Sequence, residues 1–486
     1  MTLRRSAAVV LFSLLPLLAR PALAGSPEPS PAKLAAIAAI EKNSAAVGEW
    51  GRKIWEFAEP AFQEHNSSKL LADALEQAGF RVRRGAADMP TSFVAEFGAG
   101  TPVVALLAEY DALPGLSQLD QPQQQVNPRQ TAGHGCGHNL FGAAIVGAAI
   151  AAKDAMTSEK LGGTIRVYGC PAEEGGCGKA YLVRAGEFKD VDVAVHWHPG
   201  SSNSAGMKSS LAIIRFRTRF TGVSAHAAGS PQLGRSALDG VELMNVGINF
   251  LREHVTSAAR IHYVITNGGN RPNVVPQEAE AWYYIRAPRM SEAQAIFARA
   301  KKIAEGAALM TETKHEIRMI TGSYEILVNE PLARAMDANL RHIGAPQFTS
   351  EERAFAAEVR KEFGVSSKPD EEPLATRIEP VEIGMSNGST DVGDVSWVVP
   401  TVGLSVATTA REIPGHSWAN TACAGMSIGR RGSIVAAKVL AATTVDLLER
   451  PDLLKTAQRD FRRRLGETKY ATVLSDGPPP EKLDDF

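Results

Sequence analysis

The five residues His134-Gly135-Cys136-Gly137-His138 bring together three side chains that bind metal ions, separated only by glycine. Thiolate and imidazole are ligands that zinc and related divalent metals accept. Cys136 and His138 stand two residues apart, so on an extended loop both can face one metal cluster. The glycines let the backbone approach that cluster closely. This spacing predicts a metal site rather than loop histidines without a ligand.

Further potential ligands follow at the ends of predicted strands. Glu173 and Glu174 are adjacent and point in different directions, so one can bind metal while the other faces the attacking water as general base. His198 and His416 would complete two coordination spheres, and Asp111 would orient a ligating histidine. Each feature alone is common in loops and helix starts. Together, at successive strand ends, they indicate a hydrolytic site with two metal ions.

The elements around these residues predict an α/β fold. Apolar strands are expected at residues 103–107, 163–170 and 191–195, with helices at residues 139–156 and 179–186. Strands that alternate with helices favour a mostly parallel sheet covered on both faces. In such sheets ligands bind at the carboxyl ends of the strands, which is where the potential metal ligands fall.

From about residue 210 the pattern changes to that of a second domain. Arg215, Arg217 and Arg219 alternate with apolar residues, as in a half-buried strand with its polar face outward. The predicted elements up to residue 322 follow the order β-α-β-β-α-β, which is the ferredoxin-like unit. A closed unit of this size inside an α/β domain is typical of an inserted domain.

The N-terminus has the pattern of a secretory signal. Arg4 and Arg5 precede a short apolar run, and Ala22-Leu23-Ala24 offers a cleavage site. The paired arginines leave twin-arginine export open beside the general secretory route. We therefore expect a secreted or periplasmic protein without membrane contact after cleavage. The predicted organisation is a signal peptide at 1–24, a catalytic domain at 25–209 and 323–465, the inserted domain at 210–322, and a loose tail at 466–486.

Charge and cysteine content exclude some other classes of protein. The 486 residues include 52 Lys+Arg and 53 Asp+Glu, so no basic surplus indicates nucleic-acid binding. Cys170 and Cys177 could pair across a loop in an oxidising compartment. A chain of this length does not need disulfides to hold its core, and the pair lacks the C-x-x-C spacing of redox proteins. Cys136 is better explained as a thiolate ligand between two histidines.

The motifs together resemble the metallopeptidase superfamily of aminoacylases, glutamate carboxypeptidases and amidohydrolases of hippurate and indoleacetyl-amino acids. Within it, the resemblance is strongest to the amidohydrolases of the p-aminobenzoyl-glutamate hydrolase type, and it spans roughly residues 33–450. The matching motifs are Asp111-Ala112-Leu113-Pro114, His134-Gly135-Cys136-Gly137-His138-Asn139, Pro171-Ala172-Glu173-Glu174, Trp197-His198-Pro199, Thr390-Asp391-Val392-Gly393-Asp394-Val395-Ser396-Trp397 and Pro414-Gly415-His416-Ser417.

The resemblance implies a role for each motif residue. It implies Glu173 as the general base and places Cys136 where relatives have a bridging carboxylate. Some relatives carry the metal-binding histidine three residues before the proline, so His196 stays open beside the favoured His198. Glu109 stands where relatives have His or Asp, and its role is open. The implied metal ligands are Cys136, His138, Glu174, His198 and His416.

The resemblance also implies that the inserted domain is a lid and a dimer interface. His226, in the motif Gly222 to Ala228, would stabilise the tetrahedral oxyanion, often in the partner's active site. A histidine that caps a turn is the alternative. Asn273 and Arg286 would hold the substrate carboxylate, a task that suits the arginine fork, although a surface arginine is equally compatible with the sequence.

We therefore expect a metal-dependent amidohydrolase with two divalent ions, zinc or manganese, in each protomer. It would cleave the amide between an acyl or aroyl group and an amino acid with a free carboxylate, as in p-aminobenzoyl-glutamate. A homodimer or a heteromer with a homologous chain is expected. The alternatives are a dipeptidase, an N-acyl-amino-acid aminoacylase, or a periplasmic metal- or peptide-binding protein without activity. Glu173 argues against the last, because binding alone needs no carboxylate beside the ligands.

Overall fold

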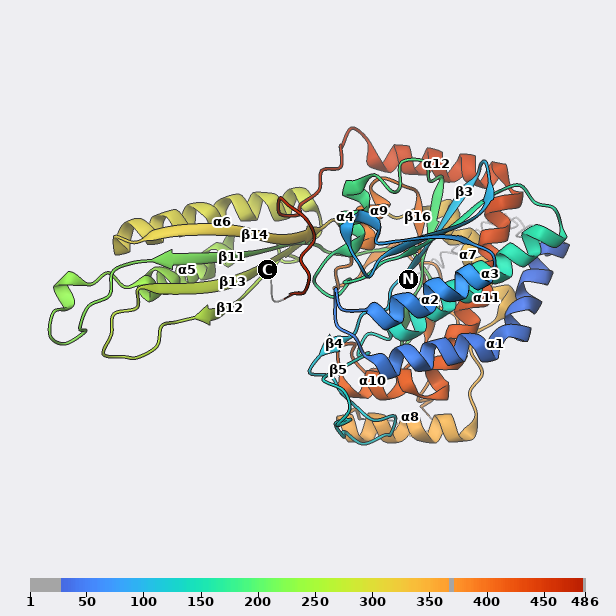
Figure 1. The fold of residues 1–486 in the computed structure, drawn as a ribbon, viewed down its shortest axis with the longest axis horizontal. Helices are drawn as coiled ribbons and strands as arrows, with labels where there is room; N and C mark the ends of the chain where they lie inside the picture. Colours follow the sequence, from blue (N-terminus) through green and yellow to red (C-terminus); the bar gives the residue numbers. More distant parts are fainter. Residues whose placement is uncertain (1–27, 367–370, 484–486) are drawn as a thin grey trace, which may run out of the picture.

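The computed structural model describes residues 28–366 and 371–483, so the predicted signal peptide lies outside the described residues. Figure 1 shows a large α/β body and, beside it, an elongated second body that extends away from it. The main hydrophobic cores of the two bodies are separate. The chain enters the elongated body near residue 210 and leaves it near residue 323, close to the limits predicted for the inserted domain.

A six-stranded sheet forms the centre of the large body. In spatial order its strands are β1 (Arg81–Arg84), β2 (Phe93–Ala99), β6 (Gly163–Gly169), β3 (Val103–Ala108), β7 (Val193–Val195) and β16 (Thr401–Val402). The last four are parallel, as predicted, whereas β1 and β2 form an antiparallel edge. Every residue of β3 and β6 is buried, as expected for strands covered on both faces.

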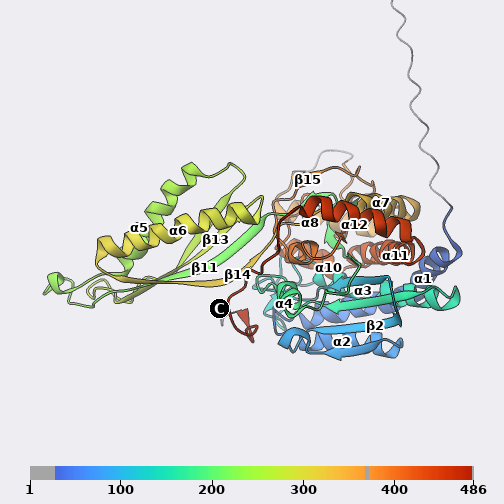
Figure 2. The ribbon, with the colours of Figure 1, turned by 90° about the horizontal axis from the view of Figure 1, so that it is seen from above.

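The two faces of the sheet pack against different helices. Val104 and Leu106 of β3 lie in the core formed with α1 (Pro31–Phe57), α3 (His138–Ser158) and α11 (Ser427–Glu449). The alternating residues Ala105 and Leu107 lie in a second core with α4 (Gly178–Ala185) and α9 (Val392–Ser396). Figure 2 shows the helices layered around the sheet from above. The period-two alternation of a strand thus produces the predicted covered sheet.

Helix α3 is the central helix of the larger core. It is long and apolar enough to cross a membrane, but 78% of its most apolar window is buried inside the protein. Its glycines allow close packing: a Cβ on Gly142 would lie 2.7 Å from both the Glu109 carbonyl oxygen and Leu71 Cδ1. This packing fixes His138, the first residue of α3, beside Glu109 at the carboxyl end of β3.

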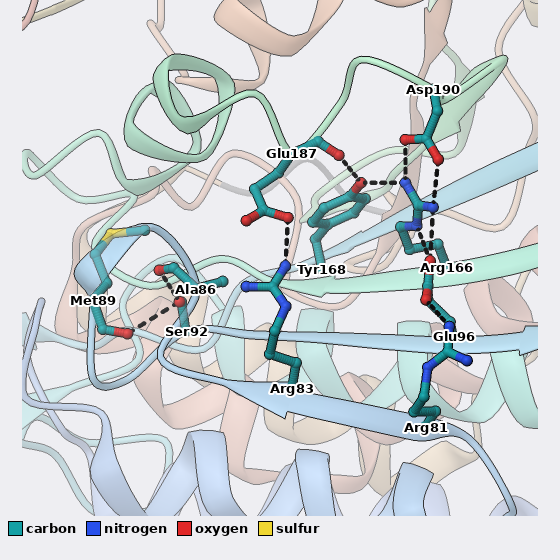
Figure 3. A network of polar contacts seen from close by, with 10 residues as sticks. All are labelled: Arg81, Arg83, Ala86, Met89, Ser92, Glu96, Arg166, Tyr168, Glu187 and Asp190. Carbon is teal, nitrogen blue, oxygen red and sulfur yellow. Dashed lines mark hydrogen bonds and ion pairs between the residues drawn. The ribbon is translucent and has the colours of Figure 1, made fainter.

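The antiparallel edge of the sheet is held by polar contacts (Figure 3). Arg166 on β6 donates to Glu96 on β2 at 2.7 Å and to Asp190 at 2.7 Å. Tyr168 donates its hydroxyl proton to the Glu187 carbonyl at 2.5 Å. These contacts attach the turn before β7 to the sheet, and β7 leads to the candidate ligand His198.

The elongated body is one antiparallel sheet covered by two helices. Its elements are β11 (Ala212–Thr221), α5 (Ala237–Leu251), β12 (Arg260–Asn267), β13 (Glu278–Ala287), α6 (Met290–Thr311) and β14 (Lys314–Ser323). The spatial order β12-β13-β11-β14 and the chain order β-α-β-β-α-β match the ferredoxin-like prediction. The core between sheet and helices includes Phe216, Met244, Tyr283 and Ile296.

Residues 466–483, which we predicted to be a loose tail, contact both bodies in the part of the chain that the structure describes. Tyr470 donates a hydrogen bond to Asp394 at 2.8 Å, and Arg184 donates to the Gly477 carbonyl at 2.7 Å. Val473 packs against the core of the inserted domain, whereas Leu474 packs into the core beside α4. This tail therefore joins the two bodies. The remaining helices of the large body are α2 (His65–Gln77), α7 (Glu330–Ile343), α8 (Ser350–Phe363), α10 (Trp418–Gly425) and α12 (Pro451–Leu465).

Candidate metal centre

Three groups of potential metal ligands meet at the carboxyl ends of the parallel strands, and two of them share Cys136. Cys136, His138 and His198 form the first, with their ligand atoms within 4.8 Å of one another. Cys136, Glu174 and His416 form the second by the same measure. Cys136 therefore belongs to both groups, which is the arrangement that two neighbouring cations with one shared ligand require.

Backbone turns set the ligands in place. Gly137 has a φ of 76°, and a Cβ there would lie 2.8 Å from Pro199 Cβ, so only glycine fits between Cys136 and His138. His416 also has a positive φ, of 58°, and its N–H donates to the Gly135 carbonyl at 2.8 Å. A loop almost three hundred residues further along the chain is thus tied to the first ligand loop.

The donor set fits divalent metal ions. The Cys136 Sγ and His198 Nε2 atoms are 3.4 Å apart, and two ligands of a tetrahedral zinc ion stand roughly 3.5 Å apart. Among the described residues, Nε2 of His138 and Oε2 of Glu109 contact each other at 3.3 Å, and Oε1 of Glu174 contacts His416 at 3.1 Å, but none of these buried atoms has a hydrogen bond of good geometry. Such atoms are costly unless a partner satisfies them. Thiolate, imidazole and carboxylate are the ligands that zinc and manganese accept.

Charges within the centre favour the thiolate form of Cys136, which is its ligand form. Burial alone would raise the pKa of the Cys136 thiol, but His198 and His138 outweigh burial and hold that pKa well below its usual value. Burial, followed by the Cys136 charge, raises the pKa of Glu174 to about 7. A thiolate and several carboxylates in one buried site thus concentrate negative charge, which cations would offset.

Asp111 contacts both ligand groups. Its Oδ1 lies 2.8 Å from His138 Nδ1, and its Oδ2 accepts a hydrogen bond from the Glu174 N–H at 2.8 Å. A carboxylate on one ring nitrogen leaves the other nitrogen of His138 directed at the metal position. This is the orienting contact that we expected from the sequence, with an added contact to Glu174.

Glu173 lies outside the two groups that share Cys136 but forms the third group with Glu109 and His138. Its carboxylate is close to those of Glu109 and to His138, and it faces the cavity of the site. Burial raises the pKa of Glu173 well above its usual value, and the charges of Glu109 and Glu174 raise it further. A carboxylate that attracts protons in this position suits a general base.

The backbone before Glu173 is held by a residue that the sequence did not indicate. Ala172 has a φ of 58°, in the left-handed region that non-glycine residues rarely adopt. Its N–H donates to Oε1 of the fully buried Glu64 at 2.8 Å. Glu64 therefore supports the turn that separates the directions of Glu173 and Glu174.

Of the two histidines left open by the sequence, His198 is in a ligand group. His196 is buried outside both groups, and its Nε2 lies 2.4 Å from the position a Cβ on Gly403 would take. Trp197 between them points into the core and donates to the Phe141 carbonyl at 3.1 Å. Strand alternation would place both histidines on one face, but the strand is interrupted at residues 196–197, between β7 and β8 (His198–Gly200), and this break separates them.

A buried ion-pair network adjoins the centre and was missed from the sequence. Lys179 Nζ lies 2.7 Å from Glu109 and 2.6 Å from Asp391, and all three side chains are fully buried. Glu109, whose role was open, thus joins Lys179 to the His138 side of the centre. Asp391 lies in a motif that the sequence singled out, but nothing local marks Lys179, because its partners come from distant segments.

A cavity of about 1250 Å³ connects the centre to the inserted domain. Its wall includes Glu173 and His198 from the large body and Arg215 and Arg286 from the inserted domain. Arg286 therefore lies where a substrate carboxylate could bind. The expectation that Arg215 points outward is wrong, because its side chain is buried with only 8% exposed. Neighbouring segments at the junction between the two bodies cover this end of β11.

Two of the predicted site residues are not brought to the centre within one chain. His226 and Asn273 are exposed, outside the cavity, in loops beyond the outer end of β11. The Ala227 N–H donates to the Asn273 carbonyl at 3.0 Å, so the two loops lie together. Figure 1 shows β11 running outward from the large body toward these loops.

Comparisons with known proteins identify the family. The family model "Peptidase family M20/M25/M40" matches residues 105–371. The chain is 42% identical over 472 residues to a p-aminobenzoyl-glutamate hydrolase subunit of Escherichia coli, covering 92% of this chain and 98% of that protein. It is 31% identical to the Xaa-Arg dipeptidase of Mus musculus, covering 95% of this chain and 100% of that protein.

A solved structure supports the fold independently. A dinuclear metal-binding peptidase of the M20 family from Bacillus subtilis superposes with a TM-score of 0.57 at 20% identity, covering 84% of this chain and 99% of that chain. The chain therefore belongs to peptidase family M20/M25/M40 and is a metal-dependent amidohydrolase.

Proposed function

We propose that the protein cleaves the amide bond between an acyl or aroyl group and an amino acid with a free carboxylate, as in p-aminobenzoyl-glutamate. The observation that carries this proposal is the position of Glu173 beside two ligand groups, in one cavity with Arg286. The p-aminobenzoyl-glutamate hydrolase relative supports the substrate class.

The chain's own residues supply the proton transfers and the substrate contacts. Glu173 takes a proton from the attacking water and returns it to the nitrogen of the leaving amine. Arg286, whose Nη1 donates to Ser389 at 2.8 Å, holds the substrate carboxylate. His226 donates to the tetrahedral oxyanion after closure of the inserted domain, or from a partner chain.

We further propose two divalent ions in each protomer, zinc or manganese, held by Cys136, His138, Glu174, His198 and His416. Bound there, such ions polarise the amide carbonyl and lower the pKa of water. The shared position of Cys136 supports a count of two. The dinuclear description of the Bacillus subtilis relative agrees with that count.

For assembly, we propose a homodimer or a heteromer with a homologous chain, formed through the inserted domain. Strand β12 is an edge strand with exposed Tyr263, Val264 and Ile265, and α5 exposes Val246 and Phe250. Exposed apolar groups on an edge strand favour pairing with another chain. The Escherichia coli relative is named as one subunit of its hydrolase, which supports the heteromer. Residues 1–24 support export to the periplasm or medium.

A second candidate is a dipeptidase, which the Xaa-Arg dipeptidase relative favours. The metal centre would serve both reactions, because both split an amide beside a free carboxylate. An N-acyl-amino-acid aminoacylase falls in the same class. These candidates differ in the side chain of the released amino acid and in the acyl group, so a substrate panel separates them.

The test is hydrolysis by purified mature protein of p-aminobenzoyl-glutamate, hippurate, an N-acetyl amino acid and alanyl-arginine. Each substrate is tested with zinc- or manganese-loaded protein and after chelation, while light scattering gives the mass of the assembly. We expect metal-dependent release of p-aminobenzoate and glutamate. Faster cleavage of alanyl-arginine would favour the dipeptidase. Folded, metal-loaded protein that cleaves none of the four would contradict the proposed function.

A further inference from the structure

The inserted domain contributes only basic charge to the cavity. Three neighbouring strands carry the charged residues: Arg215 on β11, Arg286 on β13, and Arg260 with His262 on β12. In the sheet register Arg260 stands opposite Arg286, and both Arg215 and His262 stand opposite Tyr284. The four basic groups therefore share one face of the sheet. The carboxylates of the cavity wall all come from the large body.

Among the described residues, no carboxylate forms an ion pair with these arginines. Arg215 donates to Cys177 Sγ and Thr321 Oγ1, both at 3.0 Å, while its buried Nε, like that of Arg217, has no hydrogen-bond partner among the described residues. Arg260 donates to backbone carbonyls. Within the described part of the chain, neither of these arginines nor Arg286 lies within 4.0 Å of a carboxylate. Burial and the neighbouring Arg215 lower the pKa of Arg286, as expected for crowded like charges.

The same strand shows the usual arrangement further out. Arg217, two residues after Arg215, forms an ion pair with Glu280 at 3.2 Å, and Arg219 forms one with Glu278 at 2.5 Å. Neither lines the cavity. Like charges on facing strands destabilise a sheet unless something offsets them. The outer arginines have carboxylate partners from the chain itself, whereas those at the cavity lack them.

We propose that the Arg215–Arg260–Arg286 face binds a second substrate carboxylate beside the α-carboxylate, so that the released amino acid is aspartate or glutamate. The inference rests on the proposed function and adds Arg215 as a residue that determines specificity. One α-carboxylate would neutralise one of three arginines, whereas an acidic amino acid offers two planar anions that fit arginine forks. The side chain of an Xaa-Arg substrate would instead add a fourth cation.

The test compares p-aminobenzoyl-glutamate with p-aminobenzoyl-glutamine, which has nearly the same shape but lacks the second charge. We expect kcat/KM for the glutamate substrate to exceed that for the glutamine substrate by about 100-fold. In Arg215→Met the glutamate value should fall at least about 30-fold and the glutamine value less than about threefold. Arg215→Lys should retain part of the preference. The control Arg217→Met, on the same face but paired with Glu280, should keep the wild-type ratio.

A binding measurement separates this inference from the reaction itself. Calorimetry with metal-loaded protein should show glutarate binding at least about tenfold more tightly than butyrate, with the difference reduced in Arg215→Met. Circular dichroism confirms that each variant is folded. If Arg215→Met does not fold, Arg215→Lys takes its place in both measurements. Equal turnover of the two substrates by the wild type, or equal losses in the variant, would overturn the inference and leave the proposed function intact. Glutarate binding that depends on Arg215, without turnover of any substrate, would support the carboxylate site and contradict the proposed function.

Discussion

Cys136 is the residue on which both ligand groups depend. Because it belongs to each group, Cys136→Ser should weaken both metal sites, and we expect at least about tenfold loss of metal affinity. Mass spectrometry of metal content after dialysis against a weak chelator measures this loss. Cys423→Ser is the control, because Cys423 is a buried cysteine outside the centre. Equal metal content in the two variants would rule out Cys136 as a shared ligand.

Glu64 should make stability depend on pH. Burial, and secondarily Asp111, raises the pKa of Glu64 to about 8, whereas the unfolded chain titrates near about 4.3. Between these values the folded protein holds a proton that the unfolded chain has lost. Wild-type stability should therefore fall with rising pH relative to Glu64→Gln, by at most about 1.4 kcal/mol per pH unit.

Urea unfolding at pH 5, 6, 7 and 8 gives the difference in free energy of unfolding between the two proteins. The difference should grow toward pH 8. For the exposed Glu305, the matched substitution Glu305→Gln should give a difference that does not change with pH. A constant difference for Glu64→Gln as well would show that Glu64 is ionised in the folded protein.

At the scale of single residues, the sequence indicates the metal ligands but not the residues that surround them and hold them in place. Cys136, His138 and Glu174 were predicted because metal-binding chemistry is visible in residue type and spacing. Arg215 and Lys179 were not, because their surroundings are built by segments far apart in the chain. Arg215 was expected to point outward from a half-buried strand, and its burial arises only where the two bodies meet.

Helix α3 shows how an element positions the centre. Gly142→Ala would place a Cβ 2.7 Å from the Glu109 carbonyl oxygen, so α3 must move away from β3. We expect a loss of about 1–3 kcal/mol in the free energy of unfolding and weaker metal binding, because α3 carries His138. Denaturant unfolding and metal titration measure the two effects.

Gly306→Ala, toward the C-terminal end of α6, is the matched control, since a Cβ there meets nothing within 4 Å. It should be neutral or stabilise by up to about 1 kcal/mol. If Gly142→Ala proved equally harmless, close packing of α3 would not position His138.

Helices and strands were predicted well where the apolar residues repeat with a clear period. The buried strands β3 and β6 and the β-α-β-β-α-β order of the inserted domain follow from apolar periodicity. The antiparallel edge was not predicted. Strand β1 has the sequence Arg-Val-Arg-Arg, with one apolar residue in four, so no strand period marks it. Its place is set by the neighbouring β2 and by edge ion pairs such as Arg81 with Glu96.

At the scale of the whole molecule, the C-terminal tail should contribute to stability. A chain that ends at Lys469 loses the packing of Val473 and Leu474 and leaves the buried Asp394 without Tyr470. We expect a loss of about 3 kcal/mol, measured as a lower midpoint of thermal unfolding. Tyr470→Phe removes only the hydrogen bond and should cost about 1 kcal/mol. An unchanged midpoint after truncation would mean that the tail is loose, as the sequence predicted.

The relation between the two bodies was the least predictable part of the molecule. The sequence indicated an inserted domain but not that the tail packs across to it, since Pro- and Asp-rich segments carry no periodicity. The distance of His226 from the metal centre could not be predicted from the local sequence either, because it depends on the length and direction of β11. The proposed role of His226 therefore remains a prediction that concerns closure or a partner chain.

The most direct test of the account measures metal content and turnover of Glu173→Gln in the same preparation. The substitution removes the proposed base and leaves both ligand groups that share Cys136 intact. We predict wild-type metal content and a kcat on p-aminobenzoyl-glutamate reduced at least about 100-fold, while chelation also abolishes wild-type turnover. A metal-loaded Glu173→Gln protein with wild-type kcat would contradict the account.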